Sequence, residues 1–202
     1  MDPLVIDKAK YQLKKDDFQL RVVLKYIVIT GFVGSILKDV DFEMDGNMII
    51  LKTHNLIPSL NITGSYKAEM VLSDAPTYYE GKFDIALMDL DCINELDGEL
   101  VEQCNCGCET CECDCSSGNA RKRRVVRLLK FNVFPTIGNM NIKATGLNPD
   151  PTINSLMVQM ANEYWQQFYK FLIPETKKYW EPLMIHISNR FLSAISFDSV
   201  LY

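Results

Sequence analysis

The C-terminal quarter of the chain carries one broad apolar stripe with helical spacing. Between residues 153 and 168, apolar residues recur at steps of three and four, and polar residues fill most of the intervening positions. The apolar positions are Ile153, Leu156, Met157, Met160, Ala161, Tyr164, Trp165 and Phe168. This period predicts an amphipathic helix. Methionine and aromatic side chains adapt to irregular surfaces, so the stripe is either a ligand-cavity wall or an ordinary helix face packed on a sheet.

The helix is predicted to be interrupted by proline. Proline lacks the backbone donor and clashes with the preceding turn, so we expect a bend or a restart near Pro174 and near Pro182. The apolar stripe is expected to continue through Trp180, Leu183, Met184, Ile187 and Phe191.

Two long segments before this helix alternate apolar and polar residues with period two. The first covers residues 18–33 and the second covers residues 57–72. Their apolar positions are Phe18, Leu20, Val22, Leu24, Tyr26 and Val28 in the first and Leu60, Ile62, Tyr66, Ala68, Met70 and Leu72 in the second. Alternation of this kind predicts half-buried strands. Gly64 interrupts the second apolar face as a bulge or bend would.

Shorter strands are predicted between turn signals. Their ranges are 36–44, 47–54, 82–90, 125–134 and 139–145, and the signals are Asp45-Gly46, Glu80-Gly81, Asp97-Gly98 and Ile137-Gly138. No helix of comparable length is predicted among these strands, so the sheet should be antiparallel and strongly curved. The predicted fold class is α+β, with a long, strongly curved antiparallel sheet wrapped around a long C-terminal amphipathic helix.

Several short motifs follow one another along the chain in a set order. The early ones are Asp2-Pro3-Leu4, Leu60-Asn61-Ile62-Thr63-Gly64-Ser65-Tyr66, Gly81-Lys82-Phe83 and Met140-Asn141-Ile142-Lys143. The late ones are Asn162-Glu163-Tyr164-Trp165, Pro174, Asn189-Arg190-Phe191 and Phe197-Asp198-Ser199-Val200-Leu201-Tyr202. In this order the chain resembles the insect takeout and juvenile-hormone-binding family, from residue 2 to residue 202 apart from one insertion.

The resemblance implies a tubular lipid-binding fold, in which a curved sheet wraps a long helix and encloses a tunnel for a hydrophobic ligand. It implies a single domain over residues 1–202, with a Cys-rich and basic insertion at about 101–124. The family's first segment, with a short helix and disulfide cysteines, is not found here, which predicts an N-terminally truncated domain or a fragment.

We expect a carrier that holds a juvenile-hormone-like terpenoid, a fatty acid or a related lipid in an internal apolar tunnel. The candidate lining residues are Val28, Leu60, Ile62, Tyr66, Met70, Phe83, Ile85, Met140, Ile142, Met157, Met160, Ala161, Tyr164 and Phe168. A polar head group needs only one or two hydrogen bonds, for which Tyr66, Tyr164 and Asn162 are candidates. Whether the protein also binds a receptor or another protein partner stays open.

Composition narrows the class of protein. A chain of 202 residues with 48% hydrophobic content can form a sizeable core. The net charge of -5 argues against a nucleic-acid-binding protein, and no apolar run is long enough to span a bilayer as a helix. The N-terminus does not resemble a signal peptide. The family resemblance implies secretion, whereas a complete chain without a signal would be cytoplasmic. Asn61-Ile62-Thr63 is a glycosylation acceptor that is compatible with secretion.

Six cysteines gather in the insertion. They are Cys104, Cys106, Cys108, Cys111, Cys113 and Cys115. Closely spaced thiolates can share Zn(II) or Cu(I), and no other cofactor is expected. Alternatively the segment is a disordered hairpin tip, a set of disulfides between distant members, or inserted sequence without a role. Cys92 lies apart from the cluster and is expected to be a buried apolar residue.

The basic run Arg121-Lys122-Arg123-Arg124 follows the cysteines. It could be a processing site, a nuclear address or a patch for an anionic surface, but a solvated charge run is the simplest interpretation.

No catalytic constellation is found in the sequence. The chain has two histidines, His54 and His186, and no nucleophile elbow, metalloprotease helix or phosphate-binding loop. We therefore expect a protein that is not an enzyme. The alternatives to a lipid carrier are a thiolate metal-binding or redox module on this scaffold and a protein-interaction domain with a filled core.

Overall fold

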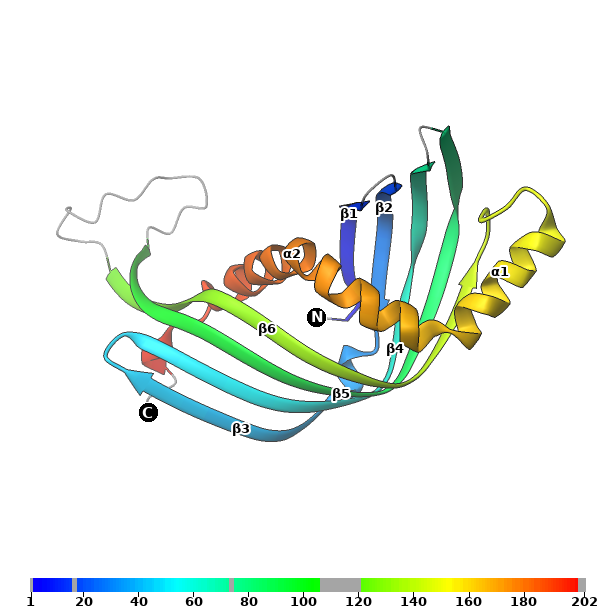
Figure 1. Ribbon diagram of the computed structural model, residues 1–202. Coiled ribbons are helices and arrows are strands. Elements are labelled where there is room, and N and C mark those ends of the chain that lie inside the picture. Colours follow the sequence, from blue (N-terminus) through cyan, green and yellow to red (C-terminus); the bar gives the residue numbers. More distant parts are fainter. Residues whose placement is uncertain (1, 16–17, 73–74, 106–120, 200–202) are drawn as a thin grey trace. The chain divides into compact units, whose positions relative to one another are not determined.

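The computed structural model describes residues 2–15, 18–72, 75–105 and 121–199 (Figure 1). The strands are β1 (Leu4–Lys15), β2 (Phe18–Thr30), β3 (Ile36–Asp45), β4 (Met48–Leu72), β5 (Ala75–Asn105) and β6 (Arg121–Ala144). The helices are α1 (Pro151–Glu163) and α2 (Trp165–Leu192), with the short 3-10 helices η1 (Phe32–Gly34) and η2 (Phe197–Ser199).

The strands form one sheet in the order β1-β2-β4-β5-β6, and β3 pairs with β4 outside this path. The pairs β1–β2 and β2–β4 are antiparallel. Since both α-helices follow the last strand, the chain has an antiparallel sheet with a C-terminal helical region. This arrangement confirms the predicted fold class. Strand β1 was missed by the sequence pattern.

Three of the four predicted turns are wrong, because their glycines lie inside strands. Only Asp45-Gly46 lies at a turn, between β3 and β4. A Cβ on Gly81 would come within 1.7 Å of the Thr145 carbonyl oxygen, and one on Gly138 within 2.8 Å of the Asp89 Cβ. These glycines therefore permit close approach of neighbouring segments. Close approach is a reason for glycine within a strand that does not require a turn. As a result, β5 extends beyond both ends of the predicted segment 82–90, and β6 is one long strand where two were predicted. β4 is also one strand where two were predicted.

The helix breaks at Tyr164 rather than at a proline. Tyr164 has φ −109° and ψ 20° at the end of α1, and α2 then runs through Pro174 and Pro182 without a restart. The start of α1 follows the usual capping rule, because the Asp150 carboxylate accepts hydrogen bonds from the backbone N–H groups of Thr152 and Ile153. Pro151 occupies the first turn, where its missing N–H is tolerated.

Contacts divide the chain into two compact units. Unit 1 comprises residues 1–38, 54–92 and 135–179, and unit 2 comprises residues 39–53, 93–134 and 180–202. The buried apolar residues of unit 1 are Leu4, Ile27, Ile57, Leu60, Tyr66, Leu87, Leu90, Cys92 and Trp165. In unit 2, Ile49, Leu100 and Phe197 form a cluster on which Val126 packs.

Helix side chains occupy both edges of the unit 1 sheet. At the β6 edge, Asn162 accepts from the Ile142 N–H at 2.7 Å and donates to the Ile142 carbonyl at 2.8 Å. Tyr169 donates to the Pro135 carbonyl at 3.0 Å. At the β1 edge, the Tyr179 hydroxyl accepts from the Gln12 N–H and donates to the Gln12 carbonyl. Since Tyr169 and Tyr179 both belong to α2, this helix contacts both edges and bridges them.

Hydrogen bonds from side chains to backbone groups of β6 also occur within unit 2. Asn189 accepts from the Leu128 N–H at 2.7 Å and donates to the Leu128 carbonyl at 3.0 Å. The Asp198 carboxylate accepts from the Arg124 N–H at 3.1 Å and from Arg124 Nε at 2.7 Å. A free strand edge can pair with strands of other chains. Here, helix and C-terminal side chains form hydrogen bonds with its backbone groups instead.

Candidate ligand site

One face of the unit 1 sheet gathers apolar side chains from neighbouring strands. Leu24 lies opposite Tyr66, and Leu20 lies opposite Met70. Directly opposed residues share a face and approach to about 5 Å. Leu60 and Tyr66 are buried on this inner face, while Ile62 and Met70 are half-buried. The strand residues predicted to line a cavity in β4 therefore lie together.

A β-bulge changes the phase of β2 in the middle of its predicted alternation. The register shifts between Lys25 and Val28, and Tyr26 has φ 52°. Beyond the bulge Val28 lies opposite Thr63, whereas Ile29 lies opposite Ile62. The expectation that Val28 shares the face of Leu24 is therefore wrong, because the extra residue of a bulge turns the following side chains to the other face.

The apolar stripe of α1 is not packed into a core. Its large members Leu156 and Met160 are 55% and 50% exposed, and α1 has no buried residue. Of the stripe's continuation in α2, Phe168 is 51% exposed, whereas Trp165 is buried. Ile153, Met157 and Tyr164 are likewise exposed, and Ala161 is half-buried. The helix is held instead by amides, because Asn154 bonds Leu147 and Ala144, and Asn162 bonds Ile142. The apolar side chains are thus left free for another contact.

The remaining candidate residues lie in unit 1 as well. Phe83, Ile85, Met140 and Ile142 are half-buried. The Phe83 ring lies against Gly64, where a Cβ would approach its Cζ to 2.7 Å. Gly64 interrupts the apolar alternation because this ring fills the space that a side chain would need.

Two of the three candidate partners for a polar head group are already bonded within the protein. The Tyr66 hydroxyl donates to the Thr145 carbonyl at 2.9 Å, and burial raises the pKa of Tyr66. The Asn162 amide is used by Ile142 and by the Val158 carbonyl. Within the described part of the chain, only the exposed Tyr164 hydroxyl has no hydrogen-bond partner among the three.

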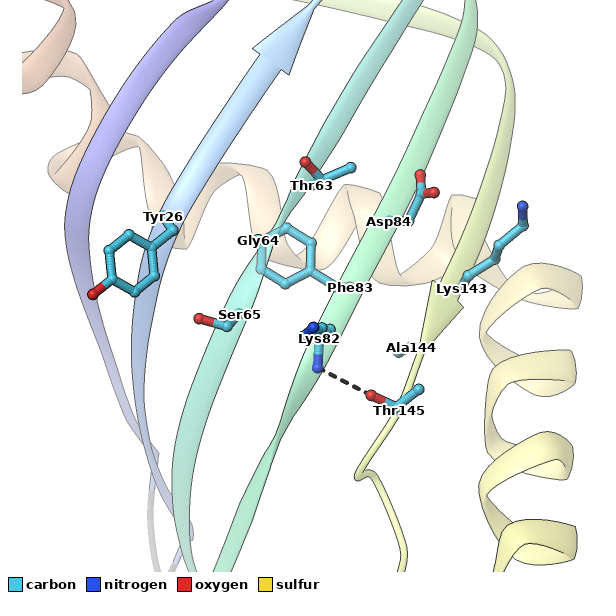
Figure 2. A pocket seen from close by; sticks show the side chains of 10 residues that line it. All are labelled: Tyr26, Thr63, Gly64, Ser65, Lys82, Phe83, Asp84, Lys143, Ala144 and Thr145. Carbon is cyan, nitrogen blue, oxygen red and sulfur yellow. Dashed lines mark hydrogen bonds between the residues drawn. The ribbon is translucent and has the colours of Figure 1, made fainter.

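A groove lies on the opposite, polar face of the unit 1 sheet (Figure 2). Its volume is about 680 Å³, and its lining residues are Tyr26, Thr63, Gly64, Ser65, Lys82, Phe83, Asp84, Lys143, Ala144 and Thr145. Thr63 and Ser65 alternate with the inward Ile62 and Tyr66, which places the groove on the outer face. Of the predicted lining residues it includes Phe83 alone, so sequence analysis did not anticipate it.

Burial governs the ionisation of a tyrosine and a thiol at the edge of unit 1. Desolvation raises the pKa of Tyr169 to about 12, with a smaller effect from Cys92. Burial also raises the pKa of the Cys92 thiol, and the Asp91 carboxylate adds to this effect. Cys92 is 6% exposed, which confirms the expected buried thiol. A thiol that stays protonated is a poor nucleophile and a poor metal ligand.

The cysteine cluster falls largely outside the described residues. Cys106, Cys108, Cys111, Cys113 and Cys115 belong to the segment 106–120, and Cys104 lies near the end of β5. Among the described residues, no group of three or more His, Cys, Asp or Glu side chains is placed to hold a metal. Metal binding at the cluster therefore stays a prediction.

Described members of the basic run take part in the fold of unit 2. Arg123 donates to the Ser193 carbonyl at 2.8 Å, and Arg124 pairs with Asp198. Hydrogen bonds from Arg124 lower the pKa of the Asp198 carboxyl. A simple solvated charge run is thus the wrong interpretation for Arg123 and Arg124, since both contact the C-terminal segment.

Two other predicted features can be placed. With its amide turned to donate, Asn61 bonds Asp84 Oδ1 at 2.9 Å and the Ile85 carbonyl at 3.1 Å, so the candidate glycosylation site is a half-buried side chain that faces β5. His54 Nε2 lies 2.7 Å from Asp91 Oδ1, and both side chains are more than a third exposed. No helix among the described residues is both long and apolar enough to cross a membrane.

Sequence reasoning missed the asparagines that hold the helices, Asn154 and Asn189. Polar residues on an amphipathic helix are expected to face solvent. The spacing of residues along the sequence does not distinguish an asparagine that bonds a strand edge from one that faces water. For Asn189 the only signal was its place at the start of a motif that carries the family resemblance, and Asn154 belongs to none of these motifs.

Comparison with known proteins agrees with this architecture. The chain is similar over 96% of its length to the crystal structure of Epiphyas postvittana Takeout 1, with a TM-score of 0.63, 16% sequence identity and 81% of that chain covered. No curated protein matches the sequence significantly. The family model of the haemolymph juvenile hormone binding protein matches residues 1–107 and 110–201. The chain therefore belongs to the haemolymph juvenile hormone binding protein family.

Proposed function

We propose that the protein is a carrier that binds a small hydrophobic ligand against the inner face of the unit 1 sheet. The observation that carries this proposal is the exposed apolar stripe of α1, which includes Met157 and Met160 and continues past the helix end to Tyr164. The helix is attached to the sheet through asparagines rather than through that stripe. Large apolar surfaces left in contact with water are typical of binding sites. The family's description, which names a hormone-binding protein of the haemolymph, supports the same function and extracellular transport.

Burial alone supplies the affinity in this proposal. A ligand of about fifteen carbons gains roughly 10 kcal/mol at about 0.8 kcal/mol for each buried methylene, before the costs of association. The ligand class is a juvenile-hormone-like terpenoid, a fatty acid or a related lipid. The exposed Tyr164 hydroxyl is the candidate partner for its polar head, since Tyr66 and Asn162 are bonded within the protein.

Binding without catalysis is part of the same proposal. The His54–Asp91 pair has no nucleophile in contact with it among the described hydrogen bonds, and a family named for binding supports a carrier.

The test is organic extraction of the purified protein followed by mass spectrometry, together with displacement of an environment-sensitive fluorophore. We expect a co-purified lipid, and displacement of the fluorophore by long fatty acids or terpenoids but not by short polar compounds. Absence of displacement by every hydrophobe at micromolar concentration would contradict the carrier function and favour a protein-interaction domain.

A further inference from the structure

The outer face of the unit 1 sheet is strongly basic, although the whole chain has a net charge of -5. We call this set of side chains the basic face. Its cations are Lys8, Lys10 and Lys14 of β1, Arg21 and Lys25 of β2, Lys67 of β4, Lys82 of β5 and Lys143 of β6, and its carboxylates are Glu69, Glu80 and Asp84. Among the residues that the structure describes, eight cations of this face thus stand against three anions.

Strand register and burial place these side chains together. Lys8 lies opposite Lys25, and Lys25 lies opposite Ser65 of the groove. Along β1 the exposed Lys8, Lys10 and Lys14 alternate with half-buried residues. Lys82, Asp84 and Lys143 line the groove together with Ser65 (Figure 2). The basic face therefore extends from β1 to β6 across the outer side of unit 1.

Among the described residues, most of these cations have no ion-pair partner. Arg21 pairs with Glu69 at 3.1 Å, and Lys67 pairs with Glu80 at 2.7 Å. The six other cations, Lys8, Lys10, Lys14, Lys25, Lys82 and Lys143, have no ion-pair partner among the described residues. The direct opposition of Lys8 and Lys25 is unfavourable in the free protein, because like charges on facing strand positions repel. An external anionic partner would relieve this repulsion.

Two exposed tyrosines accompany the lysines. Tyr26, at the groove, is 72% exposed and has φ 52°, a left-handed conformation that is unfavourable for a tyrosine. Tyr78 is 71% exposed, and its hydroxyl donates to Glu69 of the basic face at 3.5 Å. A tyrosine has an apolar ring and a polar tip, which suits the head-group region of a bilayer.

We propose that the basic face docks on the anionic surface of a phospholipid membrane, with lysine amines at the charged head groups and Tyr26 and Tyr78 at head-group level. The partner is a membrane rather than a sulfated glycan because seven of the eight cations are lysines spread over five strands. A lysine acts as a point charge that suits a fluid array of head groups, whereas a fixed sulfate favours the bidentate arginine. This proposal does not depend on the carrier function.

The experiment is co-sedimentation of the full chain with vesicles of phosphatidylcholine alone or with about 30% phosphatidylserine, near 50 and 500 mM salt. We expect binding only to the anionic vesicles, and loss of that binding at the higher salt. Each lysine near an anionic surface raises partitioning about fivefold, so Lys25→Glu with Lys82→Glu should lower it by more than about tenfold. The matched control is Lys38→Glu with Lys52→Glu, which changes two exposed lysines outside the basic face and should bind nearly as the parent chain does.

Several results would overturn the proposal. These are equal binding to neutral vesicles, an equal loss in the control variant, or retention on a heparin column without vesicle binding, which would assign the face to a glycan. Lys25→Arg with Lys82→Arg keeps the charge and should retain vesicle binding. This result, together with an unchanged thermal midpoint of the charge-reversed variant, would exclude a folding defect as the cause of lost binding. Fluorophore displacement measured in solution separates the two proposals, since the charge-reversed variant should still bind an apolar ligand.

Discussion

Asparagine side chains replace a missing strand at the β6 edge. An asparagine amide places an N–H donor beside a carbonyl acceptor, which is the pair that a neighbouring peptide would present. Asn162 and Asn189 each bond both backbone groups of one β6 residue, and Asn154 bonds two residues near the end of that strand. A polar residue on an amphipathic helix thus determines where the helix lies, while the apolar stripe of α1 stays exposed.

Removal of the Asn162 amide should therefore destabilise the fold. Asn162→Ala leaves the Ile142 N–H and carbonyl without their partner, and an unsatisfied, partly buried backbone group costs about 1 to 3 kcal/mol. Denaturant unfolding would measure the change. Asn141→Ala, at an exposed position of the same strand, is the control and should alter the free energy of unfolding by less than about 0.5 kcal/mol. Equal effects of the two substitutions would argue against the edge role.

The α1 stripe can be tested with an enlarged side chain at Met160. This residue is 50% exposed, so Met160→Trp has room for its added volume and should weaken ligand binding at an unchanged thermal midpoint. If the stripe were packed on the sheet, the same change would overpack the interior at a cost of about 1 to 3 kcal/mol. Gln159→Trp, on the polar side of α1, adds similar volume and should leave binding intact. The measurements are fluorophore displacement and thermal unfolding of each variant.

At the scale of whole elements, glycines in the long strands mark close contacts rather than turns. Gly81 and Gly146 face each other across the start of β5 and the end of β6, and a Cβ on either would lie within 2 Å of a carbonyl oxygen. Backbone atoms cannot move aside as a flexible side chain can. These positions let β5 continue past Glu80-Gly81, where a turn was predicted.

Gly81→Ala should accordingly be far more damaging than an ordinary glycine substitution. The added Cβ would lie 1.7 Å from the Thr145 carbonyl oxygen, so strands must separate locally, at about 3 kcal/mol or more. Gly34→Ala is the matched control, because its Cβ would have no neighbour closer than 4.0 Å and should shift the thermal midpoint by a few degrees at most. A soluble Gly81→Ala variant with the parent midpoint would contradict this role.

At the scale of the whole molecule, the cysteine insertion is expected to be dispensable. It lies between β5 and β6, and extra residues that connect two strands add little closure entropy. Replacement of residues 103–120 by a short Gly-Ser turn should leave ligand binding and the thermal midpoint nearly unchanged. The same variant tests the thiolate site, because bound Zn(II) or Cu(I) should disappear with the loop if the cysteines hold a metal. A collapse of the fold would show that bridges or metal in the loop support it.

The sequence by itself determined the antiparallel sheet, the C-terminal helical region and the apolar stripe, because alternation and helical period are local consequences of burying one face. It also determined the family, through short motifs in a set order. Only the tertiary structure decided which face of the sheet Val28 occupies and that Gly81 and Gly138 lie within strands. It also decided that the Asn162 amide bonds backbone groups at the β6 edge. The basic face likewise became visible only when register set lysines of distant segments side by side. Each of these features depends on contacts between residues far apart in the chain, and no local pattern records such contacts.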